Sequence, residues 1–509
     1  MRIYLNIILT FCLLISTTVL ATPQETKEHK SQPPKNDYNI VMIVLDSCRP
    51  DHLGCYAPMP SDTERPESAG HRGGYPKNTS PNIDKIAKES IVFDRAIAQS
   101  DHTLPSFGSF LTSKYPAALQ LYWTRPPKYR LSELEITLPE ILKMHNYKTA
   151  AFVTGMHPNP MLGLSQGFDI YTSMPITPTI QNITQYRLVW SFQNWINSSL
   201  EWIEANKDEK FFLMLHSNDC HPPYASPQPW PHHFASPDYP GLMDRFYLSI
   251  PLLVRIRNGI LNLKGLEKGR DYPAPAPFSP EQKQINVSDA DIRHIIDHYD
   301  GGLGYADDCV GRVTRQLQAS GLAKNTILII MSDHGEALYD RNDFNRPFGE
   351  YLYDEITRVI FMVKHPDLPP QRITGQVSLI DLTPTLLDFI GIPALSQMQG
   401  RSLMPAIKYG KPIGPDYAFS EASDSVRSIR YSGWKLIQRG DKIELYNLKN
   451  DPLEKNNLAD KEETISKELM KVLADWWNKN VSLRGPRESV ELPPEISSRF
   501  PSIAPPEDK

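Results

Sequence analysis

The sequence is short of several features that would mark it for particular roles. Its 54 Lys and Arg residues are balanced by 59 Asp and Glu residues, for a net charge of −5. This balance excludes a protein that binds nucleic acid through a basic face, so no nucleic-acid partner is expected. Its 27 glycines follow no period, which excludes a collagen-like chain. It has only 5 cysteines, and none shows the Cys/His spacing of a structural zinc site.

Long hydrophobic runs are also absent, except at the N-terminus. After a positive start at Met1-Arg2, an apolar run extends from Tyr4 to Leu20, and Val19-Leu20-Ala21 offers a small-residue cleavage site. The pattern predicts a secretory signal peptide over residues 1–21, with an uncleaved anchor as the alternative. We therefore expect a secreted or periplasmic protein. No stable membrane span is expected after cleavage, because no later stretch reaches the about 18 apolar residues that a span requires.

Four cysteines follow the predicted cleavage site, namely Cys48, Cys55, Cys220 and Cys309. An oxidising compartment would permit disulfides between them. The spacing does not determine a pairing, so both a Cys48–Cys55 bridge and buried free thiols remain open.

The body of the chain alternates apolar runs with helical patterns. Residues 39–45 form a continuous apolar run that ends at Asp46, as expected of a strand buried on both faces. Further strands are predicted at 147–154, 210–217, 326–333 and 357–364. Helical patterns fall at 81–90, 138–145, 186–205, 289–319 and 379–390. This alternation predicts an α/β fold with a mostly parallel central sheet flanked by helices.

The chain divides into one large domain and smaller parts. Residues 22–38 form a polar linker, 39–405 the α/β catalytic domain, and 406–485 a small C-terminal α+β subdomain. In the subdomain, two antiparallel strand patterns precede a helical pattern. Lys435, on the first of these strand patterns, is expected at a sheet edge, with a position that points toward the site as the alternative. Three aspartates of the 289–319 helix are expected on a solvated or capping face: Asp300, Asp307 and Asp308.

Proline is in clear excess, with 46 residues, or about 9% of the chain against an ordinary value of about 5%. The segment 221–280 holds 12 of them, and residues 486–509 form a Pro-rich tail. The first segment interrupts the alternation directly after a predicted strand. Long loops inside a compact domain are often functional. We therefore predict a Pro-stiffened insertion that covers the rim of the active site.

Two predicted strands end in acidic sequences. Asp46 closes the first strand, and Asp333-His334 closes a later one. The carboxyl ends of parallel strands meet at one edge of a sheet, so these side chains are expected together. Oxygen-rich sites favour Ca, Mg or Mn, and a histidine admits Zn. We predict that Asp46, Asp333 and His334 bind one divalent cation, with Ca preferred; a helix N-cap is the alternative for either aspartate alone.

A hydroxyl follows in the segment Ser100–Thr112. Thr103 lies just before Pro105-Ser106, where a helix is expected to begin. A hydroxyl at a helix N-terminus faces free N–H groups and the positive end of the dipole, which favours anions. A nearby cation would lower the pKa of this hydroxyl and make it a nucleophile. Simple capping of the helix by Thr103 is the alternative.

The loop after a further predicted strand is rich in titratable groups. His216 and His221 lie in the segment LHSNDCHPPY, residues 215–224. Either histidine can bind an anion or protonate a leaving group. A structural loop histidine before prolines is the alternative for His221.

Together these segments resemble the sulfatase family of the alkaline-phosphatase superfamily, in the order in which that family carries them. The matching segments are NIVMIVLDSCRPDHLGCYA (39–57), NTSPNIDKIAKES (78–90), HTLPSFGSFLTSKYP (102–116), FFLMLHSNDCHPPY (211–224), HYDGGLGYADDCVGRV (298–313), NTILIIMSDHGEAL (325–338), YLYDEITRVIFMV (351–363) and SIRYSGWKLI…ELYNLKNDPLEKNNLAD (428–460). The resemblance implies an alkaline-phosphatase-like fold. It also implies metal ligands at Asp46, Asp333 and His334, an anion contact at His221 and a loop acid at Asp219.

The sequence departs from the family at several positions. Thr103 stands where classical sulfatases carry the Cys or Ser that becomes formylglycine, so the resemblance is to a branch with Thr there. A secondary alcohol cannot give the formylglycine aldehyde, so no formylglycine is expected. Ser47 replaces the second Asp of the family's pair, and Phe107 replaces an Arg. Met156 and Phe348 stand where relatives carry a Lys and a His.

Three functions therefore compete. The preferred one is an extracytoplasmic, metal-dependent hydrolase of sulfate or phosphate esters, with Thr103 as nucleophile and His221 as a further catalytic residue. Lys114, His216 and Asp219 would bind the anionic ester, for example one carried by a sulfated or phosphorylated glycan. Without formylglycine, the chemistry suits phosphoryl transfer better than sulfuryl transfer. The alternatives are a degenerate sulfatase fold that binds anionic glycans without turnover, and a protein-interaction module.

Overall fold

The computed structural model describes residues 37–56, 77–122, 128–155, 158–173, 191–222, 224, 226–239, 256–257, 260–262, 284–341, 351–414 and 416–490. The predicted signal peptide, 1–21, lies outside these residues, as do most of the linker and most of the tail. Much of the insertion 221–280, together with Met156 and Phe348, also lies outside them.

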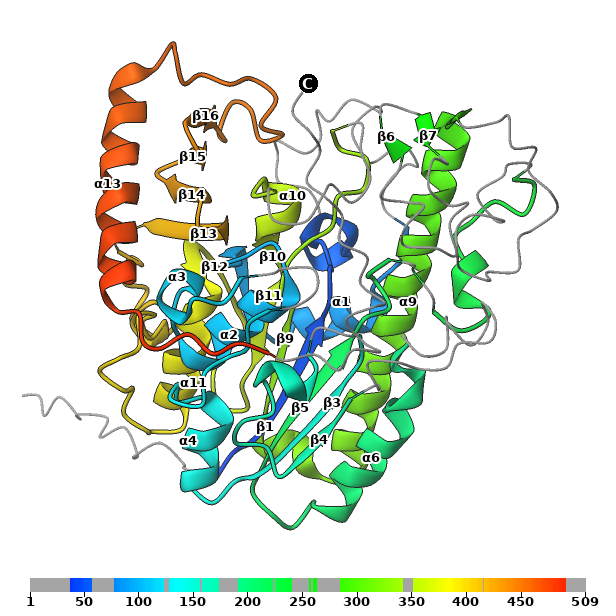
Figure 1. The fold of residues 1–509 in the computed structure, drawn as a ribbon. Helices are drawn as coiled ribbons and strands as arrows, with labels where there is room; N and C mark the ends of the chain where they lie inside the picture. Colours follow the sequence, from blue (N-terminus) through cyan, green and yellow to red (C-terminus); the bar gives the residue numbers. More distant parts are fainter. Residues whose placement is uncertain are drawn as a thin grey trace, which may run out of the picture.

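A nine-stranded sheet forms the centre of the described chain (Figure 1), in the order β10-β2-β11-β9-β1-β5-β3-β4, with β12 paired to β2. The strands are β1 (Asn39–Leu45), β2 (Ile91–Ile97), β3 (Lys148–Val153), β4 (Ile170–Thr172), β5 (Phe211–Ser217), β9 (Thr326–Met331), β10 (Arg358–Val359), β11 (Phe361–Lys364) and β12 (Gln371–Ser378). β1 pairs in parallel with β5 and β9, and β3 pairs in parallel with β5 and β4. β11 is antiparallel to β9 and β2. The predicted mostly parallel α/β sheet is confirmed.

Helices cover both faces of this sheet. One face packs against α1 (Pro81–Ala87), α6 (Ile196–Ala205) and α9 (Asp289–Ala319), and the other against α2 (Thr103–Thr112), α4 (Leu138–Met144), α11 (Leu382–Phe389) and α12 (Met404–Tyr409). Alternate residues of β1 enter the two cores, which explains why all seven of its residues are buried and most are apolar. No helix in the described ranges combines the length and apolar character that crossing a bilayer requires.

The C-terminal part is a separate antiparallel sheet, in the order β13-β14-β15-β16. Its strands are β13 (Tyr417–Ser423), β14 (Val426–Tyr431), β15 (Trp434–Arg439) and β16 (Lys442–Asn447), and α13 (Glu463–Ser482) packs on them. The Trp476 ring of α13 stacks on Phe419 of β13 with ring centroids 4.6 Å apart. This arrangement confirms the predicted α+β subdomain. Because β15 lies between two strands, the expectation that Lys435 lies at a sheet edge is wrong.

The described start of the Pro-rich insertion packs on α9. A Cβ atom at Gly301 would lie 2.2 Å from the carbonyl oxygen of Trp230, and one at Gly302 would lie 2.0 Å from that of Asp219. Only glycine therefore lets these backbones approach the helix. Three short antiparallel strands follow, β6 (Ile256–Arg257), β7 (Ile260–Asn262) and β8 (Gln284–Asn286).

The four cysteines after the predicted cleavage site are all described, and all four are free thiols. Cys48, Cys220 and Cys309 are buried, while Cys55 is partly exposed. The Cys48–Cys55 bridge is therefore not formed in this structure.

The aspartates of α9 differ from one another in burial. Asp300 is fully buried and binds His52 Nδ1 at 2.7 Å and Lys77 Nζ at 2.8 Å, so a solvated position is wrong for it. Asp307 is also buried, and its carboxylate accepts the backbone N–H groups of Asn82 and Ile83 at the start of α1. Asp307 therefore caps a neighbouring helix.

This contact gives a stability prediction. We expect Asp307→Ala to lower the free energy of unfolding by about 2 kcal/mol, because two N–H groups of α1, one buried and one partly buried, lose their acceptor. Urea denaturation measures the loss. Asp308→Ala, beside it and half-exposed, is the matched control and should cost less than about 0.5 kcal/mol. Equal losses in the two variants would contradict the capping role.

Candidate active site

Three strands of the central sheet deliver side chains to one edge. In the β1–β9 pair, Val44 lies opposite Met331, so Asp46 and Asp333 each lie two residues beyond a matched position. In the β1–β5 pair, Val44 lies opposite His216. The register of parallel strands thus places both aspartates and this histidine together at the carboxyl edge of the sheet.

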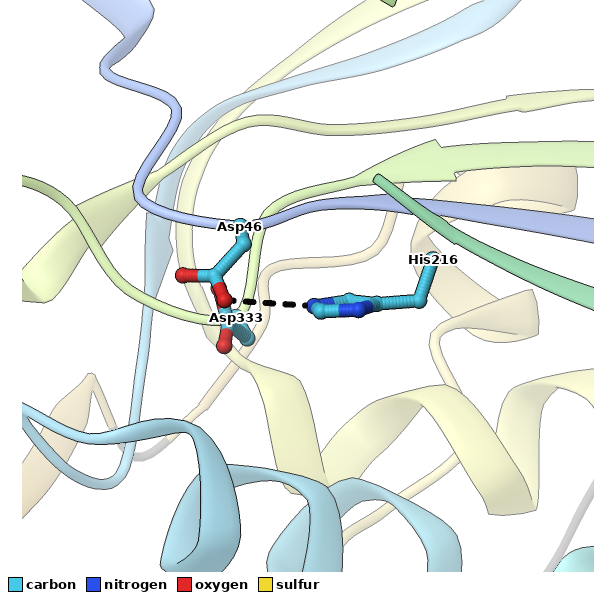
Figure 2. Close-up of side chains that lie close together, drawn as sticks. All are labelled: Asp46, His216 and Asp333. Carbon is cyan, nitrogen blue, oxygen red and sulfur yellow. Dashed lines mark ion pairs between the residues drawn. The ribbon is translucent and has the colours of Figure 1, made fainter. Parts of the chain in front are cut away.

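The three side chains form a buried cluster. Ligand atoms of Asp46, His216 and Asp333 all lie within 4.8 Å of one another. Figure 2 shows the His216 ring facing the Asp46 carboxylate, with Nε2 3.3 Å from Oδ2. None of the three is more than 2% exposed. Within the described ranges, no other three His, Cys, Asp or Glu side chains bring ligand atoms this close.

The donor atoms of this cluster suit a cation. His216 Nδ1 donates a hydrogen bond to the Thr154 carbonyl at 2.9 Å, which leaves the lone pair on Nε2. Among the described residues, His216 Nε2 and Asp333 Oδ2 are buried without a well-formed hydrogen bond, and each has only an ion-pair neighbour, Asp46 Oδ2 at 3.3 Å and His334 Nε2 at 3.5 Å respectively. Buried polar atoms are nearly always satisfied. A metal-binding histidine also usually donates its other N–H to a carbonyl or carboxylate. The residues therefore fit a divalent cation.

His334 lies at the edge of the same cluster. Its Nε2 is 3.6 Å from Asp46 Oδ1 and 3.5 Å from Asp333 Oδ2. Its Nδ1 donates to the Gly335 carbonyl at 2.8 Å, which fixes the ring. Burial alone would lower the pKa of His334, but the carboxylates of Asp333 and Asp46 raise it to about 9. The structure thus brings together the three predicted ligands and adds His216 to them.

Thr103 lies beside this cluster as the first residue of α2, so the helix begins two residues before the predicted start at Pro105. Its Oγ1 is 3.5 Å from Asp46 Oδ2 and 3.3 Å from His334 Nε2. Further along α2, the Ser106 hydroxyl donates to the carbonyl of Asp333 at 2.7 Å. This bond ties the N-terminus of the helix to the loop that carries Asp333.

His221 is an electrostatic neighbour of the cluster. Its Nδ1 donates to the carbonyl of Pro222 at 2.7 Å, so its Nε2 also carries the lone pair in the neutral ring. Burial lowers the pKa of His221, although the charge of Asp46 opposes this shift. His221, His216 and His334 therefore each have Nδ1 engaged by a carbonyl.

The two aspartates respond oppositely to their surroundings. Burial would raise the pKa of Asp46, but the charges of the three neighbouring imidazoles, with His221 the strongest, hold it below its ordinary value. Burial and the charge of Asp46 raise the pKa of Asp333. Two like charges close together in a buried site favour a protonated carboxyl unless a cation compensates them.

Two predicted substrate-binding residues have hydrogen-bond or ion-pair partners within the protein. Asp219 Oδ2 accepts hydrogen bonds from the Ser217 hydroxyl at 2.8 Å and the Phe192 N–H at 3.0 Å, and burial raises the pKa of Asp219 to about 6. Lys114 Nζ pairs with Glu135 at 2.6 Å. Substrate contact by Asp219 and Lys114 stays a prediction.

Sequence reasoning missed one acid near the cluster. Glu336 is 5% exposed, and burial raises its pKa to about 8, although the charge of His334 opposes this shift. Ser47 has φ of 60° and donates its N–H to Asp333 Oδ1 at 3.3 Å. The signal was present, because Glu336 follows Asp333 by three residues in the same loop.

Phe107 stands at the position where the resemblance to the family implied an arginine. The ring is fully buried, and its centroid lies 5.2 Å from that of His216. An apolar ring therefore packs edge-to-face with the imidazole, in place of that arginine.

The chain as a whole is similar to known sulfatases. A profile of the sulfatase family matches residues 38–392, and one for the C-terminal region of N-sulphoglucosamine sulphohydrolase matches residues 347–479. The chain is 26% identical to an ulvan-active sulfatase of Formosa agariphila, over 90% of this chain and 84% of the relative. It is 23% identical to a choline-sulfatase of Rhizobium meliloti, over 75% of this chain and 78% of the relative.

Solved structures show the same fold. An enzyme in complex with its substrate D-glucosamine-2-N,6-O-disulfate superposes with a TM-score of 0.62 at 19% identity, over 87% of this chain and 98% of that chain. A phosphonate monoester hydrolase of Agrobacterium radiobacter superposes with a TM-score of 0.62 at 18% identity, over 90% and 98%. The alkaline-phosphatase-like fold is therefore confirmed. Since the family profile also spans residues 38–392, the protein belongs to the sulfatase family and is a hydrolase that acts on sulfate esters.

Proposed function

We propose that the protein is a metal-dependent sulfatase-family hydrolase in which Thr103 is the nucleophile. The observation that carries this proposal is the position of Thr103 Oγ1, 3.5 Å from Asp46 Oδ2 at the N-terminus of α2. A hydroxyl so placed is next to the proposed cation ligands and to the free N–H groups that attract an anion. Thr103 can therefore attack a sulfuryl or phosphoryl group directly, without formylglycine.

Asp46, Asp333 and His216 would hold the cation, with His334 as a further ligand that faces Thr103. When bound, the cation would offset the carboxylate charges, favour the ionised hydroxyl and stabilise negative charge on the transferred group. Ca is the preferred ion because both aspartates offer carboxylate oxygens, which Mg and Mn also accept; the imidazoles make Zn a further alternative.

Thr103 would form a covalent ester with the transferred group, and the ester's alcohol would leave. The Thr103 hydroxyl loses a proton in this step, and the oxygen of the leaving alcohol gains one. His221, close to Asp46 and fixed through Nδ1, is positioned to contact the anion or to protonate the leaving oxygen. Water would then hydrolyse the ester on Thr103 and regenerate the enzyme.

A sulfated glycan is the substrate class that the relatives favour. One relative is active on ulvan, and one structural neighbour binds D-glucosamine-2-N,6-O-disulfate. Another neighbour hydrolyses phosphonate monoesters, which keeps phosphorus esters among the substrates to be tested. We also propose an extracytoplasmic location, supported by the apolar run near the N-terminus.

The nucleophile is tested by mutation. With p-nitrophenyl sulfate or p-nitrophenyl phosphate and each of Ca, Mg, Mn and Zn, we expect Thr103→Ala to lower kcat by about a thousandfold or more. Thr103→Ser should keep measurable activity because a hydroxyl remains. Thr112→Ala, at the far end of the same helix, is the control and should leave kcat within about threefold. Turnover that Thr103→Ala does not change would contradict the assignment, as would an inactive wild type.

The cation site is tested without turnover. In wild-type protein stripped by chelator, Ca or Zn should raise the Tm, because a ligand that binds only the folded state stabilises it. Asp333→Asn should lose this shift. Its metal-free Tm should equal or exceed that of metal-free wild type, because the repulsion between two buried carboxylates is removed. Differential scanning calorimetry measures both effects, with Asp308→Asn as control. A metal-induced shift retained in Asp333→Asn would rule out this site.

The N-terminal prediction is tested by expression in a bacterial host with a secretion pathway. We expect mature protein to begin just after Ala21, because Ala21 is a small residue directly before the predicted cleavage position. Intact-mass measurement of the product identifies the first residue. A product that retains Met1 and fractionates with membranes would instead indicate an uncleaved anchor.

A further inference from the structure

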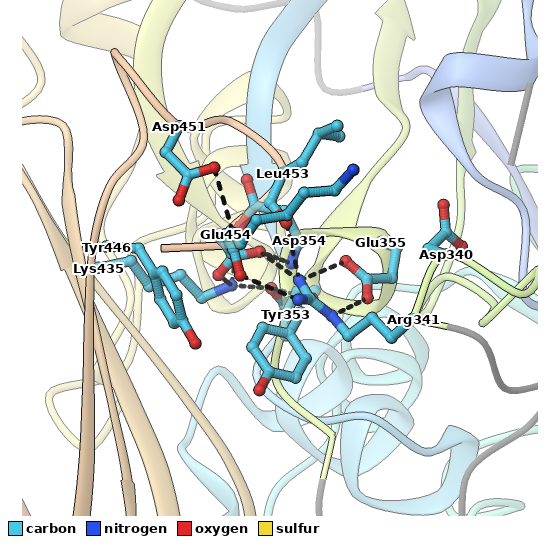
Figure 3. A network of polar contacts seen from close by, with 12 residues as sticks. Asp340, Arg341, Tyr353, Asp354, Glu355, Lys435, Tyr446, Asp451, Leu453 and Glu454 are labelled. Atoms are coloured by element: carbon cyan, nitrogen blue, oxygen red, sulfur yellow. Dashed lines mark hydrogen bonds and ion pairs between the residues drawn. The ribbon is translucent and has the colours of Figure 1, made fainter. Parts of the chain in front are cut away.

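A buried ion network joins the C-terminal sheet to the catalytic domain. Lys435, in the interior strand β15, has no exposed surface. Its Nζ lies 2.8 Å from Asp354 Oδ1 and 2.9 Å from Glu454 Oε1. Figure 3 shows the Lys435 side chain directed at these carboxylates. A buried ammonium is costly unless it is paired, so Lys435 requires both carboxylates at these positions.

Asp354 is the first residue of α10 (Asp354–Thr357), a short helix of the catalytic domain. Besides Lys435, its side chain binds Arg430 Nη1 at 2.7 Å, from β14 of the same C-terminal sheet. Its backbone N–H donates to Glu454 Oε2 at 2.7 Å. Side chains of the C-terminal subdomain thus hold both the side chain and the backbone of Asp354.

A second cation holds the next residue of the helix. Arg341 Nε lies 2.7 Å from Glu355 Oε1, and its Nη1 donates to the carbonyl of Glu454 at 2.9 Å. Figure 3 shows Arg341 between Glu355 and the 453–454 backbone. The C-terminal segment therefore contacts α10 through both Lys435 and Arg341.

The helix α10 in turn contacts the loop of the proposed cation ligands. Gly335 N–H donates to the Ile356 carbonyl at 2.7 Å, and Glu336 N–H donates to the Glu355 carbonyl at 3.1 Å. A Cβ atom at Gly335 would lie 2.1 Å from the Glu355 oxygen, so the two backbones are in direct contact. The Gly335 carbonyl also accepts the Nδ1 proton of His334.

We infer that Lys435 is a positioning residue: through Asp354 and α10, it sets the position of the loop 333–336 and so of Asp333 and His334. The inference rests on the proposed function for the role of those two residues. The physical link between Lys435 and the loop does not depend on that role. The C-terminal subdomain thereby becomes part of the active site without contacting the reacting atoms.

The link is tested by hydrogen exchange on the metal-free, full-length protein. In Lys435→Met, we expect the amides of Gly335 and Glu336 to exchange about tenfold faster than in wild type, because their acceptors on α10 are no longer held in place. Peptides of β3 and β5 should exchange as in wild type. Mass spectrometry of the peptides that span 332–338 measures the change. Lys467→Met is the matched control, because it removes an exposed lysine from α13 of the same subdomain.

Unchanged exchange at 335–336 in Lys435→Met overturns the inference, even if the protein proves to be an active metalloenzyme. Faster exchange confined to β14, β15 and β16 also overturns it, since Lys435 would then stabilise only its own sheet. If Lys435→Met does not fold, Asp354→Asn tests the same link. That variant keeps the side-chain shape and the N–H bond to Glu454 but removes the charge that Lys435 pairs with.

A kinetic measurement separates positioning from simple stability. With an ester that the wild type hydrolyses, we expect Lys435→Met to lower kcat by about tenfold while KM stays within about twofold, because ligand geometry changes and the substrate contacts do not. Failure of the proposed function would appear as an inactive wild type, and the exchange result would still stand. Wild-type kcat in a folded Lys435→Met protein contradicts the inference.

Discussion

Two carboxylates of like charge, Asp46 and Asp333, are buried beside each other at the end of a parallel sheet, and the surrounding structure depends on how that charge is offset. In a low-dielectric interior, such a pair is unfavourable unless positive charge lies close by. Three imidazoles gather at the site, and the donor atoms left over suit a cation. The apolar strands around them supply the rigid edge on which this charge is concentrated.

The three imidazoles are oriented by the same kind of hydrogen bond. His216, His221 and His334 each donate from Nδ1 to a backbone carbonyl, of Thr154, Pro222 and Gly335 respectively. Backbone carbonyls are fixed by the strands and loops that carry them, so the ring orientations follow from the main chain. None of these three Nδ1 atoms donates to a side-chain carboxylate. The negative charge of the site therefore lies on Asp46 and Asp333 and not on groups that orient the histidines.

Much of the fold was predictable from local pattern. β1 has its predicted bounds because both of its faces are covered and its apolar run therefore has clear ends. α9 has its predicted bounds because Ser288 begins it with a capping box. The strands β2 and β12 were missed, since β2 carries Asp94-Arg95 and β12 alternates in burial as an edge strand does. Periodicity alone does not distinguish such strands from loops.

The candidate site was predictable where a functional side chain directly follows a predicted strand, as Asp46 and Asp333 do. His216 was assigned to the substrate because its place within β5, opposite Val44, depends on strand pairing that the sequence does not reveal. Lys435 was expected at an edge because strand order within the small sheet was unknown. In each case the missing information was which segments lie side by side.

The glycines of α9 limit which sequence changes the segment after β5 can accept during evolution. Gly301 and Gly302 touch the backbones of Trp230 and Asp219, on either side of His221 in the chain. A single methyl group on the helix would push away the segment that follows β5, while leaving every residue of that segment unchanged. A helix distant in sequence thus constrains how the loop after His221 can vary. Changes in substrate preference would therefore have to arise in the part of the insertion that follows the segment packed against these two glycines.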